Sequence, residues 1–232
     1  MTSSTKTLAR IAGALYLLVA IGGGFAQAVR LSVRVSGDAA ATAAQIAQHA
    51  TLFRIALGAD LLDFVAFLGV GLVLYGLLKA VSAQMALAML VINAVSVAMQ
   101  AINMALHAAV LMVATAPAYG MTSSALFFLD LHQQGYLVSQ VFFGLYLLPL
   151  GYLIYRSAMF PRVLGIVLML GCGGYLGGVA ASYLSPTLES SIATYFGLVG
   201  GLAELAFLLW LLVFGARVDT PSSVTAAKGA LA

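Results

Sequence analysis

The chain has 232 residues, of which 63% are apolar and only 7% carry a charged side chain. Soluble domains contain roughly 25% charged residues, so this composition excludes an ordinary soluble enzyme, and it also excludes intrinsic disorder, which requires low hydrophobicity and high charge. The formal net charge is +3, but the ten Lys and Arg residues are scattered singly and form no basic patch of the kind that binds nucleic acid. We therefore expect a protein whose main partner is the lipid bilayer, with no nucleic-acid partner.

Long stretches without charged side chains predict the membrane-spanning segments. A helix needs about 20 apolar residues to cross a hydrocarbon core of about 30 Å, and only helices or closed barrels can pair all their backbone groups there. The apolar runs are continuous and do not alternate with period two, which favours helices over a barrel. The sequence predicts an all-α, polytopic bundle of six transmembrane helices over residues 1–218, with spans at about 10–29, 52–78, 84–115, 126–155, 162–184 and 192–215.

The connections between the spans carry their own signals. The uncharged run over residues 80–129 would measure about 75 Å as one helix, so it must hold two spans, and residues 116–120 supply the break. Residues 39–49 predict a short interfacial helix that starts near Asp38 or Ser36. The tail over residues 219–232 lacks hydrophobic periodicity, and we expect it to be disordered and cytoplasmic.

The distribution of Lys and Arg predicts the orientation. Seven basic residues fall on the side of the two termini, whereas Arg30, Arg34 and Arg54 fall on the other. The excess of Lys and Arg on the side of the termini predicts that both termini are cytoplasmic. We expect the protein to lie in the inner membrane of the cell. The first segment also imitates a cleavable signal peptide, with Ala26-Gln27-Ala28 as a cleavage site. Its uncharged stretch exceeds the usual apolar region of about 7–15 residues, so a spanning helix is favoured.

Polar side chains inside the spans predict a functional site. An ionisable group in a span costs about 2.5–3.5 kcal/mol on insertion scales and marks a functional hypothesis. The second span places two acids three residues apart on one face, the third carries a polar stripe with steps of three and four, and His132, Tyr136 and Gln140 align in the fourth. The candidate site residues are Asp60, Asp63, Gln100, Asn103, His107, Asp130, His132 and Glu204.

Three functions are consistent with these residues. The working hypothesis is a small transporter or ligand-binding membrane protein whose polar site, in the outer half of the bilayer, takes a small molecule or an ion. The first alternative is an intramembrane metal-dependent hydrolase, because imidazole and carboxylate groups suit zinc or another divalent metal. Its candidate metal ligands are His107, His132, Asp63 and Glu204, although no local His-x-x-x-His spacing is present. The second alternative is a structural protein in which the polar groups only bond to one another across helices. None of the three identifies a catalytic residue.

Glycine spacing predicts close helix contacts. Gly173 and Gly177, Gly174 and Gly178, and Gly197 and Gly201 each stand four residues apart. Such spacing lets two helix backbones approach closely in lipid. It favours packing within the bundle, and it also suits a homodimer formed through the glycine-rich helix faces.

Several segments resemble a known family. They are Ala-Arg-Ile-Ala-Gly at residues 9–13, Leu131-His132, Gly-Tyr-Leu-Ile-Tyr-Arg-Ser at 151–157 and Pro-Arg-Val-Leu-Gly at 161–165. Together they resemble the bacterial domain-of-unknown-function family numbered 4386, over roughly residues 8–215. The resemblance implies a multi-helix integral membrane protein, and it brings no established activity, substrate or catalytic residue.

Overall fold

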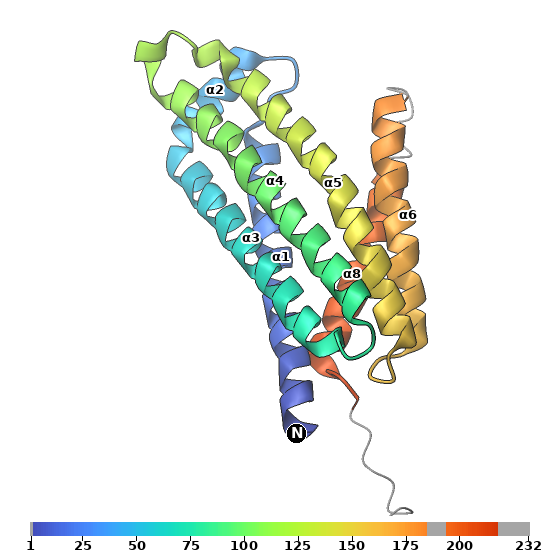
Figure 1. Ribbon diagram of the computed structural model, residues 1–232. Coiled ribbons are helices and arrows are strands. Elements are labelled where there is room, and N and C mark those ends of the chain that lie inside the picture. Colours follow the sequence, from blue (N-terminus) through green and yellow to red (C-terminus); the bar gives the residue numbers. More distant parts are fainter. Residues whose placement is uncertain (1, 185–193, 218–232) are drawn as a thin grey trace, which may run out of the picture.

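A computed structural model of the protein describes residues 2–184 and 194–217, and these form a bundle of long helices (Figure 1). The part of the chain that is described contains no strand, and six of its helices are long and apolar enough to cross a membrane. The prediction of an all-α, polytopic six-helix bundle is therefore confirmed. The predicted disordered tail lies outside the described residues. The six helices are α1 (Thr2–Val33), α3 (Ala50–Leu78), α4 (Ala83–Thr115), α5 (Ala125–Arg156), α6 (Arg162–Leu184) and α8 (Thr194–Val213).

The first helix extends past its predicted end. α1 continues to Val33, whereas the sequence predicted a span ending at residue 29 because Arg30 carries a charge. Arg30 instead lies inside the helix with only 7% of its surface exposed. An arginine can stay in this position because an acid on α3 neutralises it, as described below.

The connections follow the sequence signals. The short helix predicted after the first span is α2 (Ala39–Gln48), and the Asp38 side chain caps it by accepting a hydrogen bond of 2.8 Å from the Ala41 backbone N–H. The break predicted at residues 116–120 is present as two short 3₁₀ turns, Pro117–Tyr119 and Thr122–Ser124.

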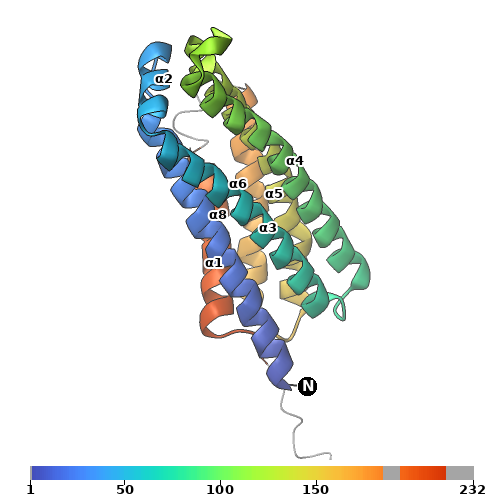
Figure 2. The same ribbon diagram turned by 90° about the vertical axis from the view of Figure 1, so that its left-hand side faces the viewer.

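The six spanning helices form a ring. α1 packs against α3, α3 against α4, α4 against α5, α5 against α6 and α6 against α8, and α8 returns to α1. The start of α1 and the end of α8 lie at one end of the bundle, while α2 lies at the other (Figure 2). We call these the terminal end and the α2 end. Which end faces the cytoplasm stays a prediction.

Two apolar clusters fill the ring. The cluster nearer the terminal end draws residues from all six spanning helices, with Tyr16, Phe67, Tyr146 and Phe207 at its centre. The cluster nearer the α2 end contains residues of α1 to α5, and among the described residues it contains none from α6 or α8. Among the described residues, the core is thus packed by all six spanning helices at one end and by fewer of them at the other.

Glycines bring particular helices close together. A Cβ atom added to Gly165 would lie 2.5 Å from the Gly151 carbonyl oxygen, and one added to Gly174 would lie 2.7 Å from the Phe196 carbonyl oxygen. These contacts join α6 to α5 and to α8. Gly173, Gly197 and Gly201 would meet nothing within 4 Å, so they serve no helix contact inside the bundle. A homodimer through these faces stays a prediction.

Candidate functional site

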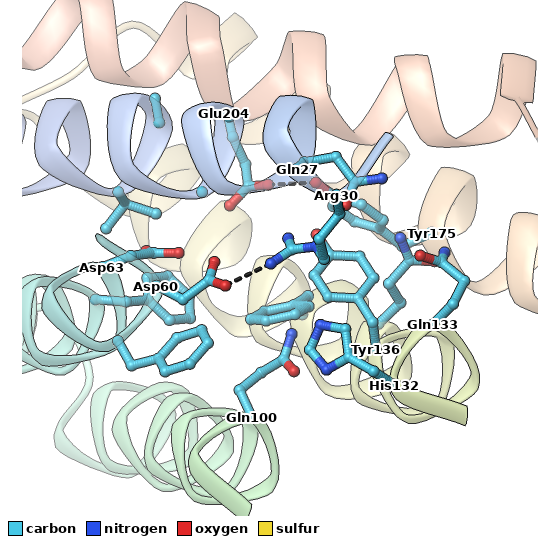
Figure 3. Close-up of a pocket in the computed structure, with 18 residues that line it drawn as sticks. Gln27, Arg30, Asp60, Asp63, Gln100, His132, Gln133, Tyr136, Tyr175 and Glu204 are labelled. Carbon is cyan, nitrogen blue, oxygen red and sulfur yellow. Dashed lines mark hydrogen bonds and ion pairs between the residues drawn. The ribbon is translucent and has the colours of Figure 1, made fainter. Parts of the chain in front are cut away.

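A cavity of about 430 Å³ lies between the two apolar clusters. Figure 3 shows the side chains that line it. Its size lies within the usual range of small-molecule sites, about 300–1,000 Å³. All six spanning helices contribute to its lining, and its apolar walls include three phenylalanines, Phe64, Phe67 and Phe143. The polar side chains that line it are Gln27, Arg30, Asp60, Asp63, Gln100, His132, Gln133, Tyr136, Gln140, Tyr175 and Glu204.

One part of the lining is a buried ion pair, which we call the paired side. The guanidinium of Arg30 on α1 contacts the carboxylate of Asp60 on α3, and both side chains are almost fully buried. The Arg30 Nε also donates a hydrogen bond of 3.1 Å to the Gln27 Oε1, which orients the guanidinium. Behind the pair, the His107 Nδ1 lies 3.3 Å from the Asp60 Oδ2 without forming an aligned hydrogen bond. Asp60 therefore has its charge balanced by a cation that remains protonated in proteins.

Polar groups of α4 and α5 meet beside this pair. The Asn103 Nδ2 donates a hydrogen bond of 3.0 Å to the His132 carbonyl oxygen, and the His132 Nδ1 lies 3.3 Å from the Asn103 carbonyl oxygen. The His107 and His132 rings are 5.1 Å apart at their centroids. The Gln100 Oε1 accepts a bond of 3.4 Å from Asn103, whereas the Gln100 Nε2 is buried without a partner. Reciprocal bonds thus fix the α4–α5 seam, and one buried amide donor of Gln100 is left without a partner.

The opposite part of the lining carries two further acids, Asp63 and Glu204, which we call the acidic side. The Tyr175 hydroxyl donates a hydrogen bond of 2.6 Å to the Glu204 Oε2. Asp63 is only 9% exposed, yet among the described residues it makes no hydrogen bond and no ion pair. A Cβ atom on Gly23 would lie 3.0 Å from the Asp63 Oδ2, so the glycine provides the space beside this carboxylate. Figure 3 shows Asp63 next to Asp60 on α3, with its carboxylate at the cavity.

The structure brings most of the predicted site residues together. Asp60, Asp63, Gln100, His132 and Glu204 line the cavity. Asn103 and His107 do not line it, but they are buried directly behind and contact His132 and Asp60 respectively. Asp130 stands apart, because it forms an exposed ion pair of 2.5 Å with Arg34. That pair links the end of α1 to the start of α5 outside the cavity.

The predicted metal ligands do not form a ligand set. Within residues 2–184 and 194–217, no three His, Cys, Asp or Glu side chains are placed so that they could hold a metal ion. The guanidinium of Arg30 contacts the Asp60 carboxylate at the cavity wall (Figure 3), where a fixed positive charge repels a divalent cation. The arrangement of His107, His132, Asp63 and Glu204 thus gives no support to the zinc hydrolase alternative.

Sequence reasoning did not select several lining residues. Arg30 was interpreted as the boundary of a span, although Gln27 three residues earlier shares its helix face. Tyr136 and Gln140 follow His132 at steps of four, a visible signal for one shared face. Tyr175 carried a weaker signal, as an aromatic residue among the glycines of α6. Its role depends on Glu204, which approaches from another helix.

Comparisons with known proteins identify the family. A family model described as a domain of unknown function (DUF4386) matches residues 11–215. An uncharacterized protein of Archaeoglobus fulgidus is 29% identical over 79 residues, which cover 34% of this chain and 45% of that protein. The chain thus spans about half the length of that relative. No solved structure matches. Because the family model covers nearly the whole chain, including every helix that lines the cavity, this multi-pass membrane protein belongs to the family of unknown function DUF4386.

Proposed function

We propose that the protein binds a small molecule in the cavity and carries it across the membrane. The observation that supports this function is an open space among charged side chains inside the bundle. Polar groups that serve only as glue between helices gain most when they close on one another. Here the Asp63 carboxylate borders the cavity and has no hydrogen-bonding partner. This favours a binding site over a purely structural role.

The position of the cavity also fits a transporter. Its rim includes Gly24 on α1 and Gln133 and Tyr136 on α5, which are exposed, and α1 and α5 are not neighbours in the ring. Toward the terminal end, the cluster around Tyr16, Phe67 and Tyr146 closes the path. A site inside the bilayer that reaches the surface on one side and is closed toward the terminal end corresponds to one state of an alternating-access cycle. With the predicted orientation, this state opens to the outer half of the inner membrane.

Cysteine accessibility tests whether the cavity opens to water. In the Gly24→Cys variant the new thiol enters space where nothing lies within 4 Å. Gly173→Cys is the matched control, because it is equally unobstructed but faces outward on α6. The native Cys172 is buried in the apolar core and serves as the background. A charged, membrane-impermeant methanethiosulfonate reacts only with a hydrated thiolate, so Gly24→Cys should react at least tenfold faster than Gly173→Cys. Equal rates would contradict the proposal.

A panel of small probes tests binding and transport. Benzyltrimethylammonium, neopentylbenzene and phenylmethanesulfonate share a benzyl group and differ in charge. At least one of them should protect Gly24→Cys from the reagent, and proteoliposomes that contain the wild-type protein should take up one of the two charged probes faster than empty liposomes do. Protection without uptake would reduce the function to ligand binding. The absence of both protection and uptake would refute the proposed function.

A further inference from the structure

The charges that line the cavity do not balance. The lining contains one basic side chain, Arg30, and three acidic ones, Asp60, Asp63 and Glu204. Arg30 is engaged by Asp60 in the buried ion pair of the paired side. The two acids of the acidic side are therefore left without a basic partner among the described residues. The cavity carries an excess of two carboxyl groups.

These two acids differ in how they are satisfied. Glu204 accepts a short hydrogen bond from the Tyr175 hydroxyl, whereas Asp63 has no hydrogen-bonding partner although nine-tenths of its surface is buried. An ionised carboxylate inside a membrane bundle is costly unless a counter-charge is present. No described side chain forms an ion pair with Asp63, and the nearby Arg30 is already paired with Asp60, so a ligand with a positive charge would supply what the site lacks.

The walls of the cavity indicate the kind of cation. Aromatic rings form a connected group beside the acids, with the Phe67 and Phe143 centroids 5.7 Å apart and the Tyr136 and Phe143 centroids 6.1 Å apart. Phe64, Tyr175 and these three rings all line the cavity. Hard metal cations require several oxygen ligands around them, whereas an ammonium group with apolar substituents is attracted by aromatic faces. Aromatic walls next to an unpaired carboxylate favour an organic cation.

We propose that the cavity binds a monovalent organic cation, that is, a protonated or quaternary amine attached to an apolar group. Its ammonium group lies against Asp63 and within reach of Glu204, and its apolar part lies against Phe64, Phe67 and Phe143. The Arg30 guanidinium on the paired side repels a second positive charge, which limits the ligand to one. This inference rests on the proposed function and names the ligand class of the same site.

The three benzyl probes test the ligand class, because neopentylbenzene has the shape of benzyltrimethylammonium without its charge. Binding of radiolabelled benzyltrimethylammonium is measured on the purified full-length protein in lipid nanodiscs, with the other two probes as competitors. The cation should bind at least tenfold more tightly than the neutral and the anionic probe. In the Asp63→Asn variant its affinity should fall at least tenfold, while competition by neopentylbenzene against the remaining signal should be unchanged. Asp130→Asn removes an acid outside the cavity and should keep the wild-type affinity within twofold.

The outcomes separate this inference from the proposed function. If Gly24→Cys is accessible to the water-soluble reagent and is protected by the neutral or anionic probe but not by the cation, the ligand class is wrong and the proposed function stands. If the cation binds equally well to the wild type and to Asp63→Asn, its placement at Asp63 is wrong. If Asp63→Asn fails to fold, Glu204→Gln replaces it, and the same tenfold loss is expected. If Gly24→Cys is inaccessible, both proposals fail together.

Discussion

The polar stripe of α4 and the acidic side of the cavity contain similar side chains in opposite environments. The stripe runs through Asn93, Ser96, Gln100, Asn103 and His107, and all five are buried. At its start the Asn93 Nδ2 donates a hydrogen bond of 3.1 Å to the Phe67 carbonyl oxygen, and the Ser96 hydroxyl donates one of 2.7 Å to the Asn93 carbonyl oxygen. Five other polar atoms of the stripe have no hydrogen-bonding partner, but they are fully enclosed: Asn93 Oδ1, Gln100 Nε2, Asn103 Oδ1 and both His107 nitrogens. Asp63 also has no hydrogen bond, but it faces open volume.

The space beside the glycines shows the same difference between the stripe and the cavity. A Cβ atom on Gly71 would overlap the Asn93 amide, and one on Gly135 would overlap the Asn103 amide. The space beside each of these glycines, on α3 and α5, is therefore filled by an amide of the stripe. Gly24 at the cavity would meet nothing within 4 Å. Polarity within a spanning helix thus does not by itself mark a site, and the space opposite the polar group decides which role it has.

The largest effect is expected from removing the cation of the paired side. Arg30→Met leaves the Asp60 carboxylate buried and uncompensated, which should lower the free energy of unfolding by about 3–5 kcal/mol. Arg34→Gln, just after the end of α1, is the matched control, because its pair with Asp130 is exposed and should contribute at most about 1 kcal/mol. Reversible unfolding in mixed micelles measures both. If the double variant Arg30→Met with Asp60→Asn recovers none of the loss, the ion pair is not its cause.

A smaller effect is expected from adding a methyl group to a glycine that packs against the stripe. In Gly135→Ala the new methyl group must displace the Asn103 amide, which is held by its bond to the His132 carbonyl oxygen. Overpacking of this kind should cost about 1–3 kcal/mol. Gly24→Ala makes the same change where space is free and should alter the free energy of unfolding by less than about 1 kcal/mol. The same unfolding assay measures both variants. Equal losses of unfolding free energy would contradict the distinction between glycines with a packed neighbour and glycines with free space beside them.

Local patterns were sufficient to predict the helices and the buried stripe. Continuous apolar runs specify spanning helices because the bilayer leaves the backbone few alternatives, and steps of three and four place Asn93 to His107 on one face. The convergence of Asp63 and Glu204 at one cavity was also expected from their depth in the spans. Each of these features follows from the sequence of a single helix or from the depth of a residue in the membrane.

Pairing between helices was not accessible from the sequence. Arg30 looked like the end of a span because its partner Asp60 lies thirty residues away on another helix, and only the pair makes its burial tolerable. Tyr175 gained its role from Glu204 in the same way. Asp130 was selected as a site residue because it is an acid near the polar face of α5, but its exposed partner Arg34 holds it outside the cavity. The missing information is the rotation of each helix about its own axis.

The smallest effect on stability is expected from replacing Asp63, which lies on the same helix as the structurally paired Asp60. Asp60 and Asp63 lie three residues apart on α3, and both line the cavity. Asp63→Asn breaks no hydrogen bond and no ion pair among the described residues. The free energy of unfolding should therefore change by less than about 1 kcal/mol. We expect an increase, because the substitution removes a buried unpaired charge. Asp60→Asn makes the same chemical change but strands the buried Arg30 and should cost about 3–5 kcal/mol. Unfolding of the two variants side by side measures the difference. A loss at Asp63 as large as that at Asp60 would mean that Asp63 also stabilises the fold, and its unpaired state would then no longer point to a ligand.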